Sequence, residues 1–151
     1  MIVDAFNKNW KKIVIITNTD NKLFRKLKSI SKENISWKLN ISFEEIKKYY
    51  SEAKAFLFPP EEDFWLVPIE AMASWTPVIA FWKWWALETV VDSETWVFFG
   101  EQTVESLNKA IERFEKLSFD YDKIKKHSEK FDKKYFKQNI LEFIEKNMKK
   151  D

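Results

Sequence analysis

Short apolar runs of strand length alternate with segments of helical period along most of this chain, and this alternation restricts the fold more than any other feature. The apolar runs lie at 12–17, 35–37, 55–59, 76–81 and 96–99. The segments of helical period lie at 21–30, 42–53, 67–73, 86–91 and 103–117. Because strands that alternate with helices pair in parallel and need helices over both faces, the sequence predicts an α/β fold with a Rossmann-like parallel sheet.

Local signals refine this assignment. Ser42 and Glu45 have the spacing of a capping box, which predicts a helix start at Ser42, and Pro68 suits the first turn of another helix. From residue 121 onward, apolar residues recur among many lysines, which indicates two amphipathic helices over about 121–151. The length suits one domain, 1–151, with a core of its own.

Charge and cysteine content exclude several classes of protein. The net charge of +2 gives no electrostatic case for a nucleic-acid partner. The chain has no cysteine, which excludes disulfides and thiolate chemistry, and no apolar run approaches the roughly 20 residues of a membrane span. A cytoplasmic location is therefore expected, and the lysine-rich C-terminal helices leave peripheral contact with the inner membrane face as a further option.

The expected fold places ligands beyond the carboxyl ends of the strands, where loops lead into helix N-termini. Two such loops carry candidate residues. Run 55–59 is followed by four carboxylates: Glu61, Glu62, Asp63 and Glu70. Run 76–81 is followed by Lys83 and Glu88. Both loops are expected to open at the same edge of the sheet, and free N–H groups of the following helices could receive an anion such as a diphosphate.

Glycine is almost absent, although such loops and turns need it. Average usage of about 7% would give about ten glycines in a chain of this length. This chain has one, Gly100, and eight tryptophans. Tight turns require backbone with positive φ, which glycine adopts freely and tryptophan adopts only under strain. The eight tryptophans are therefore unusual in a chain whose turns call for glycine.

The run EEDFWLVPIEAMASWTPVIAFWKWWALETVVDSETWVFF resembles the C-terminal donor-binding domain of the group 1 (family 4) GT-B glycosyltransferases. The family pattern reads approximately E-x-F-G-L-x-x-x-E-A-M-A-x-G-x-P-V-I-A, then G-x-G-G-x-x-E, then T-G. The phrases around it are closest to mannosyltransferase-like members, and the resemblance implies one half of a GT-B fold. Tryptophan stands where the family has glycine, or where a turn calls for it: Trp10, Trp37, Trp65, Trp75, Trp82, Trp84, Trp85 and Trp96.

We interpret all eight tryptophans as glycines of the native protein, encoded by UGA in a lineage that reads this codon as glycine. Eight tryptophans and one glycine together approach the expected number of glycines. Two alternatives stay open: deliberate glycine-to-tryptophan substitution, and a genuine aromatic-rich site in which indoles stack on a sugar. UGG codons at these positions would exclude the interpretation, and UGA codons would support it.

The resemblance also implies the site. Glu62 and Glu70 match the family's E-x7-E signature, in which Glu62 would be the catalytic-site carboxylate on the donor sugar and Glu70 would hold the nucleotide ribose. The other donor-binding residues implied are Asp63, Phe64, Trp65, Leu66, Trp82, Lys83, Trp84, Trp85 and Glu88. No metal and no cofactor are expected, because the nucleotide-diphosphate sugar is itself the donor substrate.

The implied activity is that of a retaining hexosyltransferase. It would move a sugar from GDP-mannose or a UDP-sugar to a glycan or lipid-linked acceptor. The family's N-terminal acceptor domain, and the Arg and Lys that neutralise the leaving diphosphate, have no counterpart in residues 1–151. This chain would then be a fragment, or one half of a split enzyme whose N-terminal domain is on another chain. Two alternatives are a non-catalytic nucleotide-sugar-binding or interaction module, and an unrelated doubly wound domain, since a fold does not determine a function.

Overall fold

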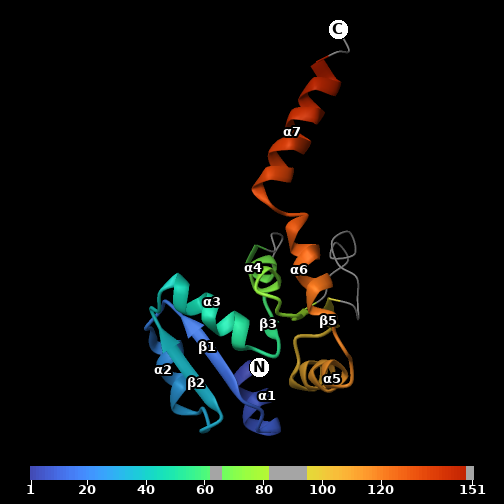
Figure 1. Ribbon diagram of the computed structural model, residues 1–151. Coiled ribbons are helices and arrows are strands. Elements are labelled where there is room, and N and C mark those ends of the chain that lie inside the picture. The colour runs from blue at the N-terminus through green and yellow to red at the C-terminus, as the bar shows by residue number, and fades with distance from the viewer. Residues whose placement is uncertain (62–65, 82–94, 149–151) are drawn as a thin grey trace.

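The computed structural model describes residues 1–61, 66–81 and 95–148 (Figure 1). Its strands are β1 (Ile13–Thr17), β2 (Ile35–Leu39), β3 (Phe56–Phe58), β4 (Val78–Phe81) and β5 (Trp96–Phe99). Its helices are α1 (Ile2–Asn9), α2 (Lys22–Ser29), α3 (Phe43–Glu52), α4 (Leu66–Ala73), α5 (Val104–Glu115), α6 (Tyr121–Glu129) and α7 (Lys133–Met148). Every strand and helix predicted within these residues is present. The helix predicted at 86–91 lies outside them.

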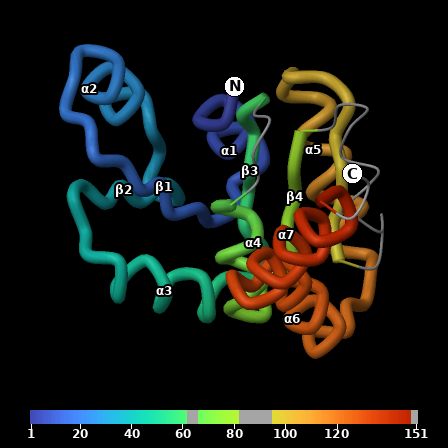
Figure 2. Tube along the Cα trace, turned by 90° about the horizontal axis from the view of Figure 1, so that it is seen from above, coloured from blue at the N-terminus to red at the C-terminus, as the bar shows by residue number. Residues whose placement is uncertain are grey.

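All strand pairings among the described residues are parallel, as the alternation predicts. β1 pairs with β2, and β3, β4 and β5 pair in that order. The strands form two sections rather than one continuous sheet, because β1 and β3 are not joined by a ladder among these residues. In both views, β1 and β2 lie to one side of β3 (Figures 1 and 2).

The three-stranded section carries helices on both faces, because its apolar side chains alternate in direction. Ile79, Val97 and Phe99 belong to the cluster that contains buried residues of α1 and α5. Their neighbours along the strands, which include Val78 and Trp96, pack instead with Met72 of α4 and Ile124 of α6. The predicted Rossmann-like arrangement, with helices over both faces, is confirmed.

The start of α3 confirms the capping box. The Ser42 hydroxyl accepts a hydrogen bond from the Glu45 backbone N–H at 3.2 Å, and the Glu45 carboxylate accepts one from the Ser42 N–H at 3.0 Å. Two backbone donors that the first turn leaves free are thereby satisfied. These hydrogen bonds also lower the pKa of the Glu45 carboxyl below its ordinary value.

Two of the four described tryptophans occupy left-handed backbone at helix ends. Trp10 ends α1 with φ of 59° and donates its N–H to the Phe6 carbonyl at 3.0 Å. Trp75 follows α4 with φ of 60° and donates to the Met72 carbonyl at 2.9 Å. Glycine is the usual residue in this conformation after a helix. Trp37 and Trp96 lie in strands, where any residue fits the backbone.

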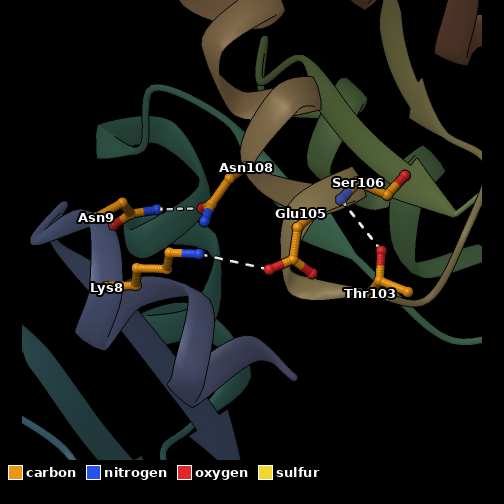
Figure 3. A network of polar contacts seen from close by, with 6 residues as sticks. All are labelled: Lys8, Asn9, Thr103, Glu105, Ser106 and Asn108. Carbon is orange, nitrogen blue, oxygen red and sulfur yellow. Dashed lines mark hydrogen bonds and ion pairs between the residues drawn. The ribbon is translucent and has the colours of Figure 1, made fainter.

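Helices α1 and α5 are also joined by polar contacts (Figure 3). Lys8 forms an ion pair with Glu105 at 3.4 Å, and the Asn9 amide donates to the Asn108 side chain at 2.7 Å. Thr103 caps α5 by accepting the Ser106 N–H at 3.2 Å. These contacts hold α5 against the beginning of the chain, so that both helices cover one face of the strands.

The C-terminal residues form the two predicted helices. α6 packs against α4 through Ile124, and the Lys125 ammonium donates to the Ala73 carbonyl at 2.9 Å. α7 extends away from the body, and none of its residues is buried (Figure 1). None of the helices within the described ranges is long and apolar enough to cross a membrane.

Candidate functional site

The carboxyl ends of β3 and β4 define the edge at which the predicted donor site should lie. The two strands are parallel neighbours, with Phe58 beside Ala80. The chain therefore leaves both strands at the same edge, as the sequence predicts. α4 begins at Leu66, close in sequence to the end of β3, and the positive end of its dipole favours an anion near this N-terminus.

Two of the predicted site residues, Leu66 and Glu70, are described by the structure, and both belong to α4. Leu66 is the first residue of the helix and its side chain is exposed. The others lie outside the described residues, and their roles stay predictions: Glu62, Asp63, Phe64, Trp65, Trp82, Lys83, Trp84, Trp85 and Glu88.

Glu70 lies at a small cavity between α4 and α3. The cavity has a volume of about 270 Å³ and is lined by Glu70, Ala73 and Ser74 together with side chains of α3. Glu70 lies four residues after the first residue of α4, on the helix surface, and its side chain is exposed. A carboxylate in this position is accessible to a ligand and can accept hydrogen bonds from its hydroxyl groups.

Tyr50 is the α3 residue most affected by this carboxylate. Its side chain is buried, and this burial, together with the negative charge of Glu70, raises its pKa to about 12. The phenol therefore remains a neutral hydrogen-bond donor at neutral pH. The buried Thr76 hydroxyl donates to the Tyr50 carbonyl at 2.6 Å and thereby ties the end of α3 to the turn that follows α4.

The α3 residues that line the cavity include a cation and an exposed aromatic ring. Lys47 lies 2.9 Å from the Glu44 carboxylate, and its ammonium is 4.7 Å from the centre of the Phe43 ring. Phe43 itself is half exposed and lines the same cavity. Carboxylate, ammonium, phenol and aromatic face are the groups that bind the hydroxyls, phosphates and rings of nucleotides.

The sequence reasoning did not find the contribution of α3. Phe43, Lys47 and Tyr50 follow one another at spacings of four and three residues, which places them on one face of a helix. This spacing was visible in the predicted helix at 42–53. What the sequence could not show is that this face lies against α4, because that contact depends on the packing of segments far apart along the chain.

A larger cleft, with a volume of about 580 Å³, lies at the carboxyl end of β1. It is lined by residues of α1, β1 and α2 and by Pro59, Pro60 and Gln102. Among the residues that the structure describes, those that line this cleft have no charged side chain. In the ranges that the structure describes, no group of three or more acidic, histidine or cysteine residues is arranged to hold a metal ion.

With this geometry established, the chain can be compared with known proteins. The sequence model of the family described as Glycosyl transferases group 1 matches residues 3–134. The chain belongs to this family. It is also 47% identical over 49 residues to the O-antigen chain mannosyltransferase RfbU of Salmonella typhimurium, a match that covers 32% of this chain and 14% of that protein.

The fold of this group 1 glycosyltransferase chain matches that of a larger solved protein. The sucrose-phosphate synthase of Thermosynechococcus elongatus aligns with a TM-score of 0.64 and 23% identity over 84% of this chain. The match covers 34% of that synthase chain. At this level of identity the likeness shows the α/β Rossmann-like fold. The chain thus corresponds to about a third of one relative and to a seventh of the other.

Proposed function

We propose that this group 1 glycosyltransferase chain binds a nucleotide-diphosphate sugar for retaining transfer of a hexosyl unit to a glycan or a lipid-linked acceptor. The observation that carries the proposal is the position of Glu70. It is the second carboxylate of the E-x7-E signature, and it lies exposed on α4, beside a cavity that α3 completes. We propose GDP-mannose as the preferred donor, and the local identity to a mannosyltransferase supports this choice.

In this proposal the Glu70 carboxylate accepts hydrogen bonds from the ribose hydroxyls. The Phe43 ring would offer a face to the base, and Lys47 would offer positive charge to a phosphate, since both line the same cavity. Glu62 would hold the donor sugar, and the N–H groups of Phe64, Trp65 and Leu66 would contact the sugar and diphosphate. Lys83 would add charge from the neighbouring loop.

The proposal includes glycine at the tryptophan positions of the native protein. Close approach of a diphosphate to backbone N–H groups requires a small residue, above all at 65, 82, 84 and 85. The left-handed backbone of Trp10 and Trp75 supports this reading, because glycine is favoured in that conformation. It does not test the positions within the loops, which are outside the described residues.

A second candidate function is binding without turnover, as a nucleotide-sugar-binding module or as one half of a split enzyme. The coverage of the relatives favours it for residues 1–151 taken alone, because they match 14% of the curated relative and 34% of the solved one. Both candidates use the same cavity. They differ in whether an acceptor domain and the two cations of the family are supplied from another part of the protein or from a partner chain.

Calorimetric titration of GDP, UDP and their mannose and glucose conjugates tests the proposal. It should be made on the chain as written and on a form with glycine at all eight tryptophan positions. Glu70→Gln should abolish the binding that the glycine form shows. The matched control is Glu33→Gln, which changes an exposed carboxylate in the turn before β2, at the opposite edge of the sheet. Equal affinities of the two variants would contradict the proposed role of Glu70.

A further inference from the structure

The end of α4 forms one wall of the cavity at Glu70, and one face of α3 forms the other. Glu70, Ala73 and Ser74 line the cavity from the α4 side, and Tyr50 is the last of the α3 residues that line it. Such a cavity keeps its shape only while the two helices keep their distance. The contacts that join α3 to the end of α4 therefore determine whether Glu70 stays beside that face of α3.

The turn after α4 fixes the direction in which the chain leaves the helix. Trp75, in left-handed backbone, donates its N–H to the Met72 carbonyl at 2.9 Å, and the Thr76 N–H donates to the Ala71 carbonyl at 3.1 Å. This pair of hydrogen bonds is the Schellman motif, which satisfies carbonyl groups that a helix end leaves free. Thr76 thereby has a defined place beyond the last turn of α4, where it is only 2% exposed.

The hydroxyl of Thr76 lies between the two walls of the cavity. Its oxygen is 2.6 Å from the Tyr50 carbonyl oxygen and 3.3 Å from the Ser74 carbonyl oxygen. A hydroxyl has one proton to donate, and the shorter distance assigns it to Tyr50. Among the described residues, no other side-chain hydrogen bond joins α3 to residues 66–76. One buried hydroxyl is thus the polar connection between the two walls.

The carbonyl that accepts this hydrogen bond belongs to the last turn of α3. Carbonyl groups in the last turn of a helix have no partner in its own ladder. The Tyr50 carbonyl instead accepts the Ala53 N–H at 3.1 Å and the Thr76 hydroxyl, one for each lone pair. Without the hydroxyl, a buried carbonyl oxygen would face an apolar group, which is unfavourable. Movement of α3 away from α4 would then allow water to replace the lost donor.

The Tyr50 side chain reports whether α3 lies against α4. Its burial, and after that the negative charge of Glu70, raise the Tyr50 pKa from 10.0 to about 12. Both causes require that the two helices stay together. Among the residues that the structure describes, Lys47 is the other charged group lining this cavity, and it lies on α3 with Tyr50. Separation of α3 from α4 would therefore return the Tyr50 pKa toward its ordinary value.

We propose that Thr76 is a positioning residue of the donor site, whose hydroxyl holds Glu70 at the distance from α3 that a bound nucleotide requires. Thr76 acts through the two helices and does not itself contact the ligand. The proposal rests on the proposed function for the identity of that ligand, and it adds a residue outside the E-x7-E signature. The part of the ligand affected is the ribose of a nucleoside diphosphate, because its hydroxyls would donate to the Glu70 carboxylate.

Variants at two positions isolate the effect of the hydroxyl. Thr76→Val removes it and keeps the branched shape of the side chain, whereas Thr76→Ser keeps it. Ser128→Ala is the matched control, because the buried Ser128 hydroxyl also donates to a backbone carbonyl at 2.6 Å, that of Lys125 within α6. If Thr76→Val does not fold, Thr76→Ala takes its place, since alanine and serine both lack the methyl group.

The first measurement needs no ligand. Carbon-13 NMR of the tyrosine rings is made at about pH 11, between the ordinary and the raised pKa of Tyr50. The Tyr50 phenol should be mainly neutral in the unchanged chain, in Thr76→Ser and in Ser128→Ala. It should be mainly ionised in Thr76→Val. A phenol that stays neutral in Thr76→Val, or that ionises equally in Ser128→Ala, would overturn the proposal.

The second measurement compares GDP with 2′,3′-dideoxy-GDP, which lacks the ribose hydroxyls. Both are titrated calorimetrically into the form with glycine at all eight tryptophan positions. In Thr76→Val the affinity for GDP should fall about tenfold, an effect typical of one lost hydrogen bond to a charged group, and Thr76→Ser should restore it. The affinity for the dideoxy nucleotide should not change. Equal losses for both nucleotides would show a general loosening and would overturn the positioning role.

The two measurements separate this proposal from the proposed function. If the unchanged glycine form binds neither GDP nor UDP, the proposed function is refuted. The Tyr50 signal would still confirm or refute the connection that Thr76 makes between α3 and α4, because it is read without a ligand.

Discussion

The left-handed backbone of Trp10 and Trp75 allows a direct test of whether these turns are built for glycine. Each tryptophan is replaced in turn by glycine and by alanine. An L-residue in this conformation costs about 1–2 kcal/mol, whereas glycine loses about 0.5–1 kcal/mol more conformational entropy than alanine on folding. The difference leaves the glycine variant more stable than the alanine variant by about 1 kcal/mol at each site.

Using alanine as the reference removes the contribution of the indoles. The Lys32 ammonium lies 4.2 Å from the centre of the Trp10 ring, and the Lys125 ammonium lies 4.8 Å from that of Trp75. Both replacements lose these contacts equally. The difference between the glycine and alanine variants therefore reflects the backbone conformation alone. It is measured as the difference in the free energy of unfolding from urea denaturation at constant m-value.

Trp37 supplies the control, because it lies in β2 with ordinary strand backbone. There the order should reverse, with the alanine variant more stable than the glycine variant by about 0.5–1 kcal/mol. A glycine variant that is less stable than the alanine variant at Trp10 and Trp75, as at Trp37, would refute the reasoning. It would also remove the structural support for native glycine at those two turns.

Three further predictions follow from the described residues. Ser42→Ala should lower the free energy of unfolding by about 1 kcal/mol at neutral pH. The pKa of the Glu45 carboxyl is lowered in the folded state, so its hydrogen bonds to Ser42 stabilise the fold above the pKa of the unfolded chain. This stabilisation is lost as the pH falls through the folded-state pKa. In chemical denaturation at acid pH, Ser42→Ala should therefore lower the free energy of unfolding by less than at neutral pH. Leu107→Ala, at a fully buried position, should cost about 2–5 kcal/mol, whereas Leu23→Ala, at an exposed one, should change stability by less than about 0.5 kcal/mol. The pKa of Tyr50, raised by burial and by the charge of Glu70 to about 12, should appear in an ultraviolet absorbance titration, and stability should fall between its ordinary pKa and about 12, since the unfolded chain loses that proton first.

Most of the fold could be predicted from the order of short apolar runs and helical segments. The strand at 35–37 was predicted too short, because its last two residues, Lys38 and Leu39, do not continue the apolar run and are recruited by pairing with β1. The separation of the strands into two sections could not be predicted. It depends on whether a neighbour lies beside β1, and the sequence of β1 is that of a strand with neighbours on both sides.

The residues that line the cavity at Glu70 could be predicted from the sequence only in part. The E-x7-E spacing indicated Glu70, which lies at a small cavity, and its role in binding stays a prediction. Lys47 and Tyr50 were missed because a capping box and an amphipathic pattern identify a helix without showing what it packs against. The loop residues from Glu62 to Trp65 and from Trp82 to Glu88 stay predictions, because the structure does not describe them.

The most direct test of the account is saturation-transfer NMR with GDP-mannose and the form of the chain that has glycine at all eight positions. The account predicts saturation of the ribose and mannose protons. The saturation of the ribose protons should be lost in the Glu70→Gln variant and kept in the Glu33→Gln variant. Saturation of the ribose protons that is equal in both variants would contradict the assignment of Glu70 to the nucleotide. No saturation of GDP-mannose or of a UDP-sugar by the glycine form would contradict donor binding by residues 1–151.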